Sequence, residues 1–310
     1  MTANAVRNTF PIKDYDLAAT LCSGQAFRWR GDGERWGGVV GRHWVRLHSD
    51  GTAISAETAD PVSDWTWLTE YLQLDTDLRA VLKGFPQDEP MRAAVKACHG
   101  LRLLRQDPWE CLASFICSST KQIVQIQKII SLLCERYGEI VTTPFGQSPA
   151  CAFPSAQTIA RLTEADLRAC KMGFRAPYLL KAAQEVAGGK LELADLQTMP
   201  VELARERLMQ LPGVGRKIAD CVLLFAYGFQ SAFPVDVWVI KGLRLLYFRS
   251  RRVNLKRLLR FSADYFGPNG GYAQQYLFHY MRTGGNLEFR NAKNEAQRRR
   301  LKSGGVIRSA

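Results

Sequence analysis

Hydrophobic positions along the chain change their spacing near residue 60. Between Gln25 and about Thr58, aromatic and β-branched residues alternate with polar ones, and the alternation is broken at Asp32-Gly33 and Asp50-Gly51. A spacing of two residues interrupted by Asp-Gly pairs is typical of antiparallel hairpins. This stretch therefore predicts a small antiparallel β-sheet.

From Ser63 onward the spacing becomes helical, with apolar residues recurring every three to four positions. A small sheet followed by a long helical region predicts an α+β, mostly α fold with two or three subdomains around sizeable cores. The predicted helices cover residues 63–85, 90–99, 108–119, 122–137, 155–170, 175–188, 201–210, 216–227, 236–248, 254–265 and 270–282.

Two of these helices flank the short turn Leu211-Pro-Gly-Val-Gly215. Helix 201–210 precedes the turn and helix 216–227 follows it, so the segment is interpreted as a helix-hairpin-helix. Such a turn directs unpaired backbone N–H groups and the positive end of a helix toward an anion such as a DNA phosphate. Gly213, Val214 and Gly215 are the predicted phosphate contacts, although Pro-Gly-x-Gly turns also join helices in many proteins.

Lys217 lies in the first turn of the second helix, and Asp236 follows further along the chain after Phe233-Pro-Val. The positive helix end and apolar neighbours favour a neutral amine, which can attack carbon. Asp236 stands before an apolar run, so it also fits the N-cap of the next helix. A solvated lysine and a simple cap are the plain alternatives. The combination of turn, amine and carboxylate indicates DNA chemistry through an amine nucleophile.

Charge and hydropathy agree with a nucleic-acid partner. The net charge of +13 and the isoelectric point near 9.5 favour a polyanion, although they also suit an anionic membrane surface. No apolar run reaches the roughly 18 residues that span a bilayer. The first residues lack an apolar signal core, so we expect an intracellular protein without a membrane partner.

The chain contains eight cysteines, at positions 22, 98, 111, 117, 134, 151, 170 and 221. They are scattered through apolar helical stretches, as expected of small core residues in an intracellular protein. None follows Cys221, so the four-cysteine loop of a C-terminal iron–sulfur site is missing, and the four histidines show no metal spacing. We predict no metal and no other cofactor.

Six short motifs carry a resemblance to a known family. They are Ser23-Gly-Gln-Ala-Phe-Arg-Trp29, Leu103-Leu-Arg-Gln-Asp-Pro108, Ser114-Phe-Ile-Cys-Ser-Ser119, Leu211-Pro-Gly-Val-Gly-Arg-Lys-Ile-Ala-Asp-Cys221, Phe233-Pro-Val-Asp236 and Tyr272-Ala-Gln274. In this order they resemble the 8-oxoguanine DNA glycosylase/AP lyase family, from about residue 8 to residue 282. The resemblance implies the helix-hairpin-helix DNA glycosylase fold, in which an antiparallel sheet similar to half of a TATA-binding protein packs on two helical subdomains.

The resemblance also implies a division of the chain. Residues 8–105 would form the N-terminal sheet-containing domain, and residues 106–282 the helix-hairpin-helix catalytic domain. Residues 283–310 are polar and basic, and we expect them to be a disordered extension. The chain is expected to act as a monomer on double-stranded DNA containing 8-oxoguanine.

The activity implied by the resemblance is that of a bifunctional enzyme of base excision repair, acting on a base flipped out of the duplex. Breaking the N-glycosidic bond builds positive charge on the sugar, which the carboxylate of Asp236 would stabilise. Attack of the Lys217 amine on C1′ displaces the base and leaves a Schiff base. The 3′ phosphate then departs by β-elimination, so a lysine here implies lyase activity as well as base removal.

Base recognition follows from the same resemblance. The lesion has N7–H where guanine has an acceptor, and the backbone carbonyl of Gly24 would accept from it, a discrimination worth ~1–3 kcal/mol. Cys221 and Phe278 would sandwich the base, and Gln274 would read its Watson–Crick edge. Cys221 lies four residues after Lys217, and Phe278 lies four after Gln274, so each pair shares a helix face. Core packing explains the spacing of Cys221 and Phe278 equally well.

Residues expected at the opposite base depart from the family pattern. Thr120-Lys-Gln122 stands where animal and fungal members have Asn-Asn-Asn, and Gln125 stands where they place a cytosine-reading arginine. The second such arginine is kept as Arg175. Phe174 replaces a wedging tyrosine, and Trp238 replaces a phosphate-contacting histidine. We expect looser discrimination of the opposite base.

Two other classes of protein stay open from the sequence. A helix-hairpin-helix glycosylase for alkylated purines or oxidised pyrimidines would share the hairpin. Lys217 argues against a lysine-free alkylpurine enzyme, and the missing iron–sulfur cysteines argue against the endonuclease III type. A non-catalytic DNA-binding module would need the hairpin and the charge, but neither Lys217 nor Asp236.

Overall fold

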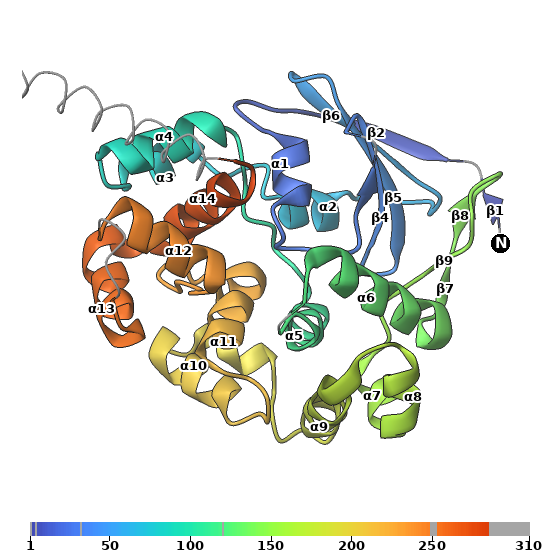
Figure 1. The fold of residues 1–310 in the computed structure, drawn as a ribbon. Helices are drawn as coiled ribbons and strands as arrows, with labels where there is room; N and C mark the ends of the chain where they lie inside the picture. The colour runs from blue at the N-terminus through green and yellow to red at the C-terminus, as the bar shows by residue number, and fades with distance from the viewer. Residues whose placement is uncertain (1, 4, 32, 120, 249–252, 285–310) are drawn as a thin grey trace, which may run out of the picture.

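The computed structural model describes residues 2–3, 5–31, 33–119, 121–248 and 253–284. A five-stranded antiparallel sheet lies on one side of the molecule, and a larger group of helices occupies the rest (Figure 1). The predicted α+β, mostly α fold is confirmed. The sequence expectation for the tail after residue 284 lies outside the described residues.

The sheet has the strand order β2-β6-β5-β4-β3. It begins earlier than predicted, because β2 pairs antiparallel with β6 from Val6 opposite Thr58 to Pro11 opposite Ala53. The predicted strand character of residues 25–29 is wrong, since these residues form a loop whose aromatic side chains pack into the core. The strands are β2 (Val6–Pro11), β3 (Arg30–Gly31), β4 (Arg35–Val40), β5 (His43–Ser49) and β6 (Ala53–Thr58).

Four helices lie close to the sheet or follow it. The sequence analysis missed α1 (Leu17–Cys22). The predicted single helix over 63–85 is wrong, because Gln73 takes a left-handed conformation with φ 55° and ends α2 (Thr66–Leu72). Asp77 then caps α3 (Leu78–Lys83). The fourth is α4 (Glu89–Ala97).

The helical part forms the main hydrophobic core. The predicted helix over 155–170 is two helices, because Thr163 starts a second one through reciprocal bonds with Asp166. The helices are α5 (Pro108–Cys117), α6 (Ile123–Tyr137), α7 (Ala156–Ala160), α8 (Glu164–Ala169), α9 (Ala176–Ala187), α10 (Val201–Met209), α11 (Arg216–Val222), α12 (Val237–Leu246), α13 (Leu255–Phe266) and α14 (Gly270–Arg282).

Shorter elements connect these helices and strands. Residues 140–151 form small strand pairs that were not predicted. These elements are β1 (Thr2–Ala3), β7 (Ile140–Val141), β8 (Thr143–Pro144), β9 (Ala150–Cys151), the 3-10 turns η1 (Gly173–Arg175), η2 (Ala194–Thr198) and η4 (Gly267–Asn269), and the π-helical turn η3 (Leu223–Tyr227).

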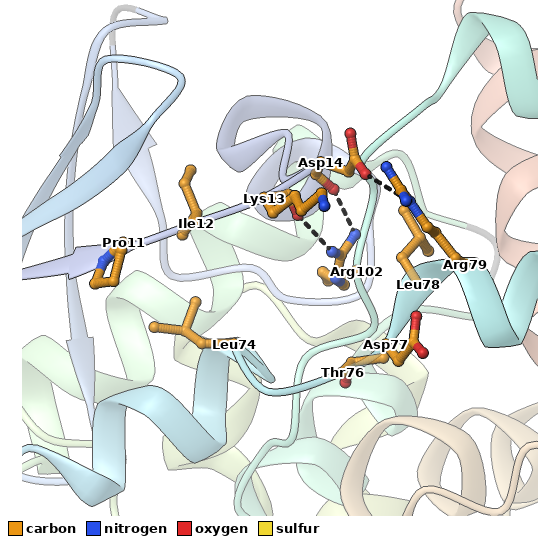
Figure 2. A pocket seen from close by; sticks show the side chains of 10 residues that line it. All are labelled: Pro11, Ile12, Lys13, Asp14, Leu74, Thr76, Asp77, Leu78, Arg79 and Arg102. Atoms are coloured by element: carbon orange, nitrogen blue, oxygen red, sulfur yellow. Dashed lines mark hydrogen bonds and ion pairs between the residues drawn. The ribbon is translucent and has the colours of Figure 1, made fainter.

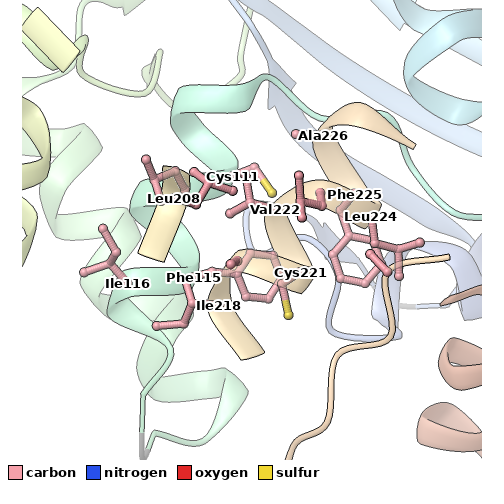
Figure 3. Packing of buried hydrophobic residues seen from close by; sticks show 14 of the residues in the cluster. Cys111, Phe115, Ile116, Leu208, Ile218, Cys221, Val222, Leu224, Phe225 and Ala226 are labelled. Atoms are coloured by element: carbon pink, nitrogen blue, oxygen red, sulfur yellow. The ribbon is translucent and has the colours of Figure 1, made fainter. Parts of the chain in front are cut away.

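The hairpin has the predicted form. α10 ends before the turn, α11 begins after it, and the π-helical turn η3 extends α11 until Gly228, whose φ of 74° ends it. A buried ion pair of 2.5 Å between Arg205 and Asp220 joins α10 to α11. Figure 3 shows the apolar face of α11 packed on α5, where Cys221 and Ile218 lie beside Phe115. This packing fixes the direction in which α11 presents its other residues.

Three further observations concern cysteines, metals and membranes. All eight cysteines are free thiols; six are buried, Cys151 is partly exposed and Cys22 is exposed. In the described ranges, no cluster of three or more His, Cys, Asp or Glu side chains is placed to hold a metal ion. None of the helices described here has both the length and the apolar character needed to cross a bilayer.

Candidate active site

A cavity of about 800 Å³ opens where the loop after α1 meets α5, α6, α11, α12 and α14. These helices surround the same central region in Figure 1. Four of the predicted site residues line the cavity together, namely Gly24, Lys217, Asp236 and Phe278. Its wall also includes Phe27, Phe115, Ser118, Ser119, Lys121, Gln122, Ile123, Val124, Ile126, Val235, Val237, Trp238, Ile240 and Arg282.

Lys217 is held by two contacts from α5 and its C-terminal end. Its Nζ donates to Ser118 Oγ at 3.1 Å and lies 5.0 Å from the centroid of the Phe115 ring. The hydroxyl of Ser118 in turn donates to the carbonyl of Phe115 at 2.7 Å, which leaves an oxygen lone pair for the amine. The lysine is half-buried. These contacts give the amine a defined position in the cavity wall.

The sequence left open whether Asp236 is a helix cap or a site residue. In the structure it caps α12 and also lines the cavity. Its Oδ1 accepts from the Val239 backbone N–H at 2.8 Å, at the start of α12. Burial raises the pKa of Asp236, while backbone hydrogen bonds from α12 and the charges of Lys217 and Arg282 act to lower it. The carboxylate is therefore oriented by its own helix and faces positive charge.

Gly24 sits in the loop after α1 rather than directly before a strand. Its φ of 79° lies in the left-handed region, and an added Cβ would stand 2.8 Å from Ile123 Cδ1 and 3.4 Å from Phe278 Cε1. A side chain at this position would therefore be strained and would enter the cavity wall. The structure explains the glycine by both backbone conformation and close approach.

Two glutamines that the sequence analysis did not single out hold the Gly24 loop in place. Gln25 is fully buried; its Nε2 donates to the Arg102 carbonyl at 2.8 Å and its Oε1 accepts from the Leu104 N–H at 2.8 Å. Gln275 of α14 donates to the Ser23 carbonyl at 3.0 Å. The loop after α1 is thus fixed both to the segment between α4 and α5 and to α14.

The other predicted base-contacting residues differ in their exposure to the cavity. Phe278 is half-buried and lines it, whereas Cys221 and Gln274 are buried and do not belong to its lining residues. Burial raises the pKa of the Cys221 thiol to about 12, so the thiol is neutral. Gln274 Oε1 is buried and has no hydrogen-bond partner among the described residues. A buried unpaired acceptor is costly unless a ligand supplies a donor.

Of the described residues predicted at the opposite base, Gln125, Phe174 and Arg175 lie outside the cavity lining. Gln125 is exposed, and its Oε1 accepts from the Gln122 backbone N–H at 3.1 Å in a capping box at the start of α6. Phe174 is 54% exposed, and the guanidinium of Arg175 lies 4.1 Å from its ring centroid. Arg175 is buried and donates to the Ser119 carbonyl. Thr120 lies outside the described residues.

The three hairpin residues have different surroundings. Gly213 has φ 78°, and an added Cβ would stand 2.5 Å from the Tyr178 ring. Val214 is buried, so its side chain anchors the turn from inside. Gly215 is the N-cap residue of α11 and has open space around it. Its exposed position leaves the first N–H groups of α11 accessible to an anion.

Two further cavity residues escaped the sequence analysis. Ser118 belongs to one of the six motifs, but the motif gives no indication that its hydroxyl bonds Lys217 from 99 positions away. Arg282 lies one helical turn after Phe278, and that spacing is the only local signal for its place in the site. Both contacts depend on how distant helices pack.

Fold and site together define a helix-hairpin-helix protein that presents an amine and a carboxylate in one cavity. The 8-oxoguanine DNA glycosylase N-terminal domain matches residues 8–112, and the HhH-GPD superfamily of base excision DNA repair proteins matches residues 113–264. Together with the relatives below, these matches show that the chain belongs to the 8-oxoguanine DNA glycosylase/lyase family. The division of the chain at residue 105 stays a prediction.

Curated relatives and solved structures agree with this assignment. The N-glycosylase/DNA lyase OGG1 of Arabidopsis thaliana is 32% identical over 87% of this chain and 79% of its own length. The N-glycosylase/DNA lyase of Saccharomyces cerevisiae is 30% identical over 84% of this chain and 82% of its own length. A solved structure shows the Clostridium acetobutylicum 8-oxoguanine glycosylase/lyase bound to DNA with cytosine opposite 8-oxoguanine. It is 31% identical to this chain, with a TM-score of 0.82, and the match covers 90% of this chain and 98% of that one.

A more distant likeness concerns the fold alone. The 3-methyladenine DNA glycosylase of Archaeoglobus fulgidus is 21% identical, with a TM-score of 0.71 over 88% of this chain and 98% of that one.

Proposed function

We infer that this protein is a bifunctional DNA glycosylase and AP lyase that removes 8-oxoguanine from duplex DNA. The observation that carries this inference is the presence of Lys217 and Asp236 in one cavity beside the hairpin. Relatives that are named N-glycosylase/DNA lyase, and that align with most of the chain, support the same activity. An amine nucleophile accounts for base removal and strand cleavage by one site.

The cavity takes the flipped base in this proposal. Its volume of about 800 Å³ lies in the range of pockets that enclose small organic ligands. Phe278 offers an aromatic face to the purine, and Cys221 packs on the other side as a neutral thiol. The unpaired Oε1 of Gln274 accepts from the donors on the Watson–Crick edge of the lesion. The Gly24 carbonyl accepts from N7–H.

The chemistry is divided between Lys217 and Asp236. The amine attacks C1′ as the base departs, and the ionised carboxylate stabilises the positive charge that develops on the sugar. Ser118 and Phe115 orient the amine from α5. Ring opening of the sugar gives the Schiff base, and β-elimination then breaks the strand on the 3′ side.

The remaining contacts follow from the same proposal. The hairpin residues Gly213, Val214 and Gly215 bind backbone phosphate with the N-terminus of α11. Phe174, Arg175 and Gln125 contact the gap and the opposite base. The protein acts as a monomer on DNA inside the cell.

Single-turnover excision from four duplexes tests the proposal. The duplexes carry 8-oxoguanine, guanine, an alkylated purine or an oxidised pyrimidine at one position opposite cytosine. We expect release of 8-oxoguanine with a nick at the same site, and rates roughly fivefold to a hundredfold lower for guanine, because the mismatched contact between its N7 and the Gly24 carbonyl costs ~1–3 kcal/mol. Faster excision of the alkylated purine, or base release without a nick, would contradict it.

A further inference from the structure

Arg282 is the last residue of α14 and lines the cavity one turn beyond Phe278. Its guanidinium carbon lies 5.5 Å from the centroid of the Phe278 ring. One of its nitrogens, Nη1, lies 3.1 Å from the position that a Cβ on Gly24 would take. Arg282 is therefore next to two of the residues that hold the flipped base in the proposed function.

The guanidinium of Arg282 has few bonds within the protein. It carries five N–H donors, and in the described part of the chain one of them makes a long hydrogen bond of 3.5 Å to the Cys22 carbonyl. The side chain is half-buried, and its surroundings include the carboxylate of Asp236. Burial lowers the pKa of Arg282, while Cys22 and Asp236 act to raise it. Donors of a partly desolvated cation are thus available to a ligand in the cavity.

Base departure creates a charge that such a cation can stabilise. As the Lys217 amine bonds to C1′, the C1′–N9 bond breaks and its electron pair stays on the purine. The negative charge spreads over the nitrogens and carbonyl oxygens of the ring system. The amine loses one proton, and the purine gains one, so the products are a substituted amine and a neutral base. A fixed donor beside the purine lowers the barrier to this step.

We propose that Arg282 is a further catalytic residue, which hydrogen-bonds the flipped purine and stabilises the negative charge that the base gains on leaving. The proposal rests on the proposed function and adds a group to its mechanism. Asp236 stabilises the positive charge on the sugar, Lys217 forms the new bond to C1′, and Arg282 stabilises the negative charge on the departing base. A guanidinium is suited to this role because it donates in a fixed planar fork to acceptors of a purine.

Comparison of two substrates separates this role from a purely structural one. The first duplex carries 8-oxoguanine opposite cytosine, and the second carries a preformed abasic site, from which no base departs. Arg282→Met keeps an apolar stem over Phe278 and removes the donors. With saturating enzyme in single turnover, we expect excision to slow by about 10²-fold, a typical effect of losing one such donor. Nicking of the abasic duplex should stay near the wild-type rate.

Three additional variants sharpen the test. Arg282→Lys keeps the charge without the fork and should fall between the wild type and Arg282→Met. Arg282→Ala should regain excision when ethylguanidinium is added at millimolar concentration. Arg46→Met is the matched control, because Arg46 also lies over an aromatic ring, at 5.2 Å from Trp44, but outside the cavity lining. It should leave both rates unchanged.

Two outcomes would overturn the role of Arg282. One is wild-type excision by Arg282→Met, and the other is a parallel loss of excision and abasic-site nicking that ethylguanidinium does not restore. A wild-type protein that neither excises 8-oxoguanine nor nicks an abasic site would instead contradict the proposed function itself.

Discussion

Asp236 caps a helix, and in the proposed function the same side chain also takes part in the chemistry. Its carboxylate caps α12 through the Val239 N–H and lies in the cavity with Lys217. Burial raises the pKa of Asp236, so the folded protein binds the proton more tightly than the unfolded chain does. Stability contributed by this group therefore decreases as pH rises through the folded pKa, and at neutral pH its ionised form opposes folding. In the proposed function, the ionised carboxylate is kept for catalysis rather than for stability.

Asp236→Asn should separate these two tasks. The amide oxygen can still accept from Val239, and the buried charge is removed, so we expect the melting temperature to equal or exceed that of the wild type. Excision should slow by about 10²-fold or more, because the charge beside the developing cation is lost. Thermal unfolding and single-turnover rates at neutral pH measure both effects. A lower melting temperature with unchanged excision would show that the charge of Asp236 serves stability and not catalysis.

The pH dependence of the wild type belongs to the same residue. The proposed mechanism requires an ionised carboxylate, so excision should be lost as pH falls through the pKa of Asp236. Because burial raises that pKa, the loss should occur at a higher pH than for an ordinary aspartate. The acidic limb should be absent in Asp236→Asn.

In the proposed function, Gln125, Phe174 and Arg175 discriminate the opposite base. A bidentate arginine contact with a base is worth about 1–3 kcal/mol, so Gln125 in place of an arginine should reduce the preference for cytosine by roughly tenfold to a hundredfold. Gln125→Arg should sharpen that preference. The measurement is single-turnover excision of 8-oxoguanine opposite C, A, G and T in both proteins. Strict cytosine dependence in the wild type would refute the expectation.

At the scale of elements, the two glycines of the hairpin should respond differently to alanine. In Gly213→Ala the new methyl group would clash with the Tyr178 ring. The left-handed φ at this position alone costs a non-glycine residue about 1–2 kcal/mol, so the melting temperature should drop by several degrees. Gly215→Ala enters open space and should change stability less. It should nevertheless weaken DNA binding, because its methyl group would stand between the turn and the phosphate that the proposed function places there. Equal melting temperatures for the two variants would contradict this account.

The spacing of apolar residues predicted most elements but missed those governed by local backbone conformation. The hairpin, α5, α6 and α14 have strong helical periodicity and were expected at nearly their observed positions. The break at Gln73 was not predictable, because glutamine rarely adopts the left-handed conformation that it has there. The strand β2 was missed because it joins the sheet through β6, more than forty residues further along the chain.

The site was predictable where its residues belong to motifs and unpredictable where contacts join distant segments. Lys217 and Asp236 could be singled out because an amine next to a hairpin turn and a carboxylate before a helix indicate their chemistry from residue type and position. Gln25 and Ser118 lie inside recognised motifs, yet their partners become known only when the helices and the loop after α1 are packed. Arg282 could not be placed in the site from the sequence, because its position there depends on how closely α14 packs on Gly24.

At the scale of the whole molecule, the surface cavities are not equivalent. A cavity of about 540 Å³ lies near the end of β2. There the Arg102 guanidinium donates to the carbonyls of Lys13 and Asp14 (Figure 2). Arg79 lies 3.6 Å from the Asp14 carboxylate there. Backbone carbonyls thus accept from Arg102, and the Asp14 carboxylate pairs with Arg79, so these groups brace the segment after β2. The larger cavity, in contrast, presents an amine, a carboxylate and a guanidinium to its interior.

The positive charge of the chain should govern its nonspecific affinity for DNA. The net charge is +13, and basic residues outnumber acidic ones after Arg282. Deleting residues 284–310 should leave excision chemistry intact while lowering affinity for undamaged duplex and flattening its dependence on salt concentration, because fewer counterions are released. Fluorescence anisotropy over a salt series measures the slope. An unchanged slope would show that these residues do not touch phosphate.

Borohydride trapping tests the central claim most directly, because it captures the bond between Lys217 and the sugar. The wild type is incubated with a duplex containing 8-oxoguanine opposite cytosine, reduced, digested and mapped by mass spectrometry. We predict a covalent adduct on the peptide that contains Lys217, and in Lys217→Gln no adduct and no nick although lesion binding persists. An adduct of wild-type yield in Lys217→Gln, or one mapped to another residue, would contradict the account.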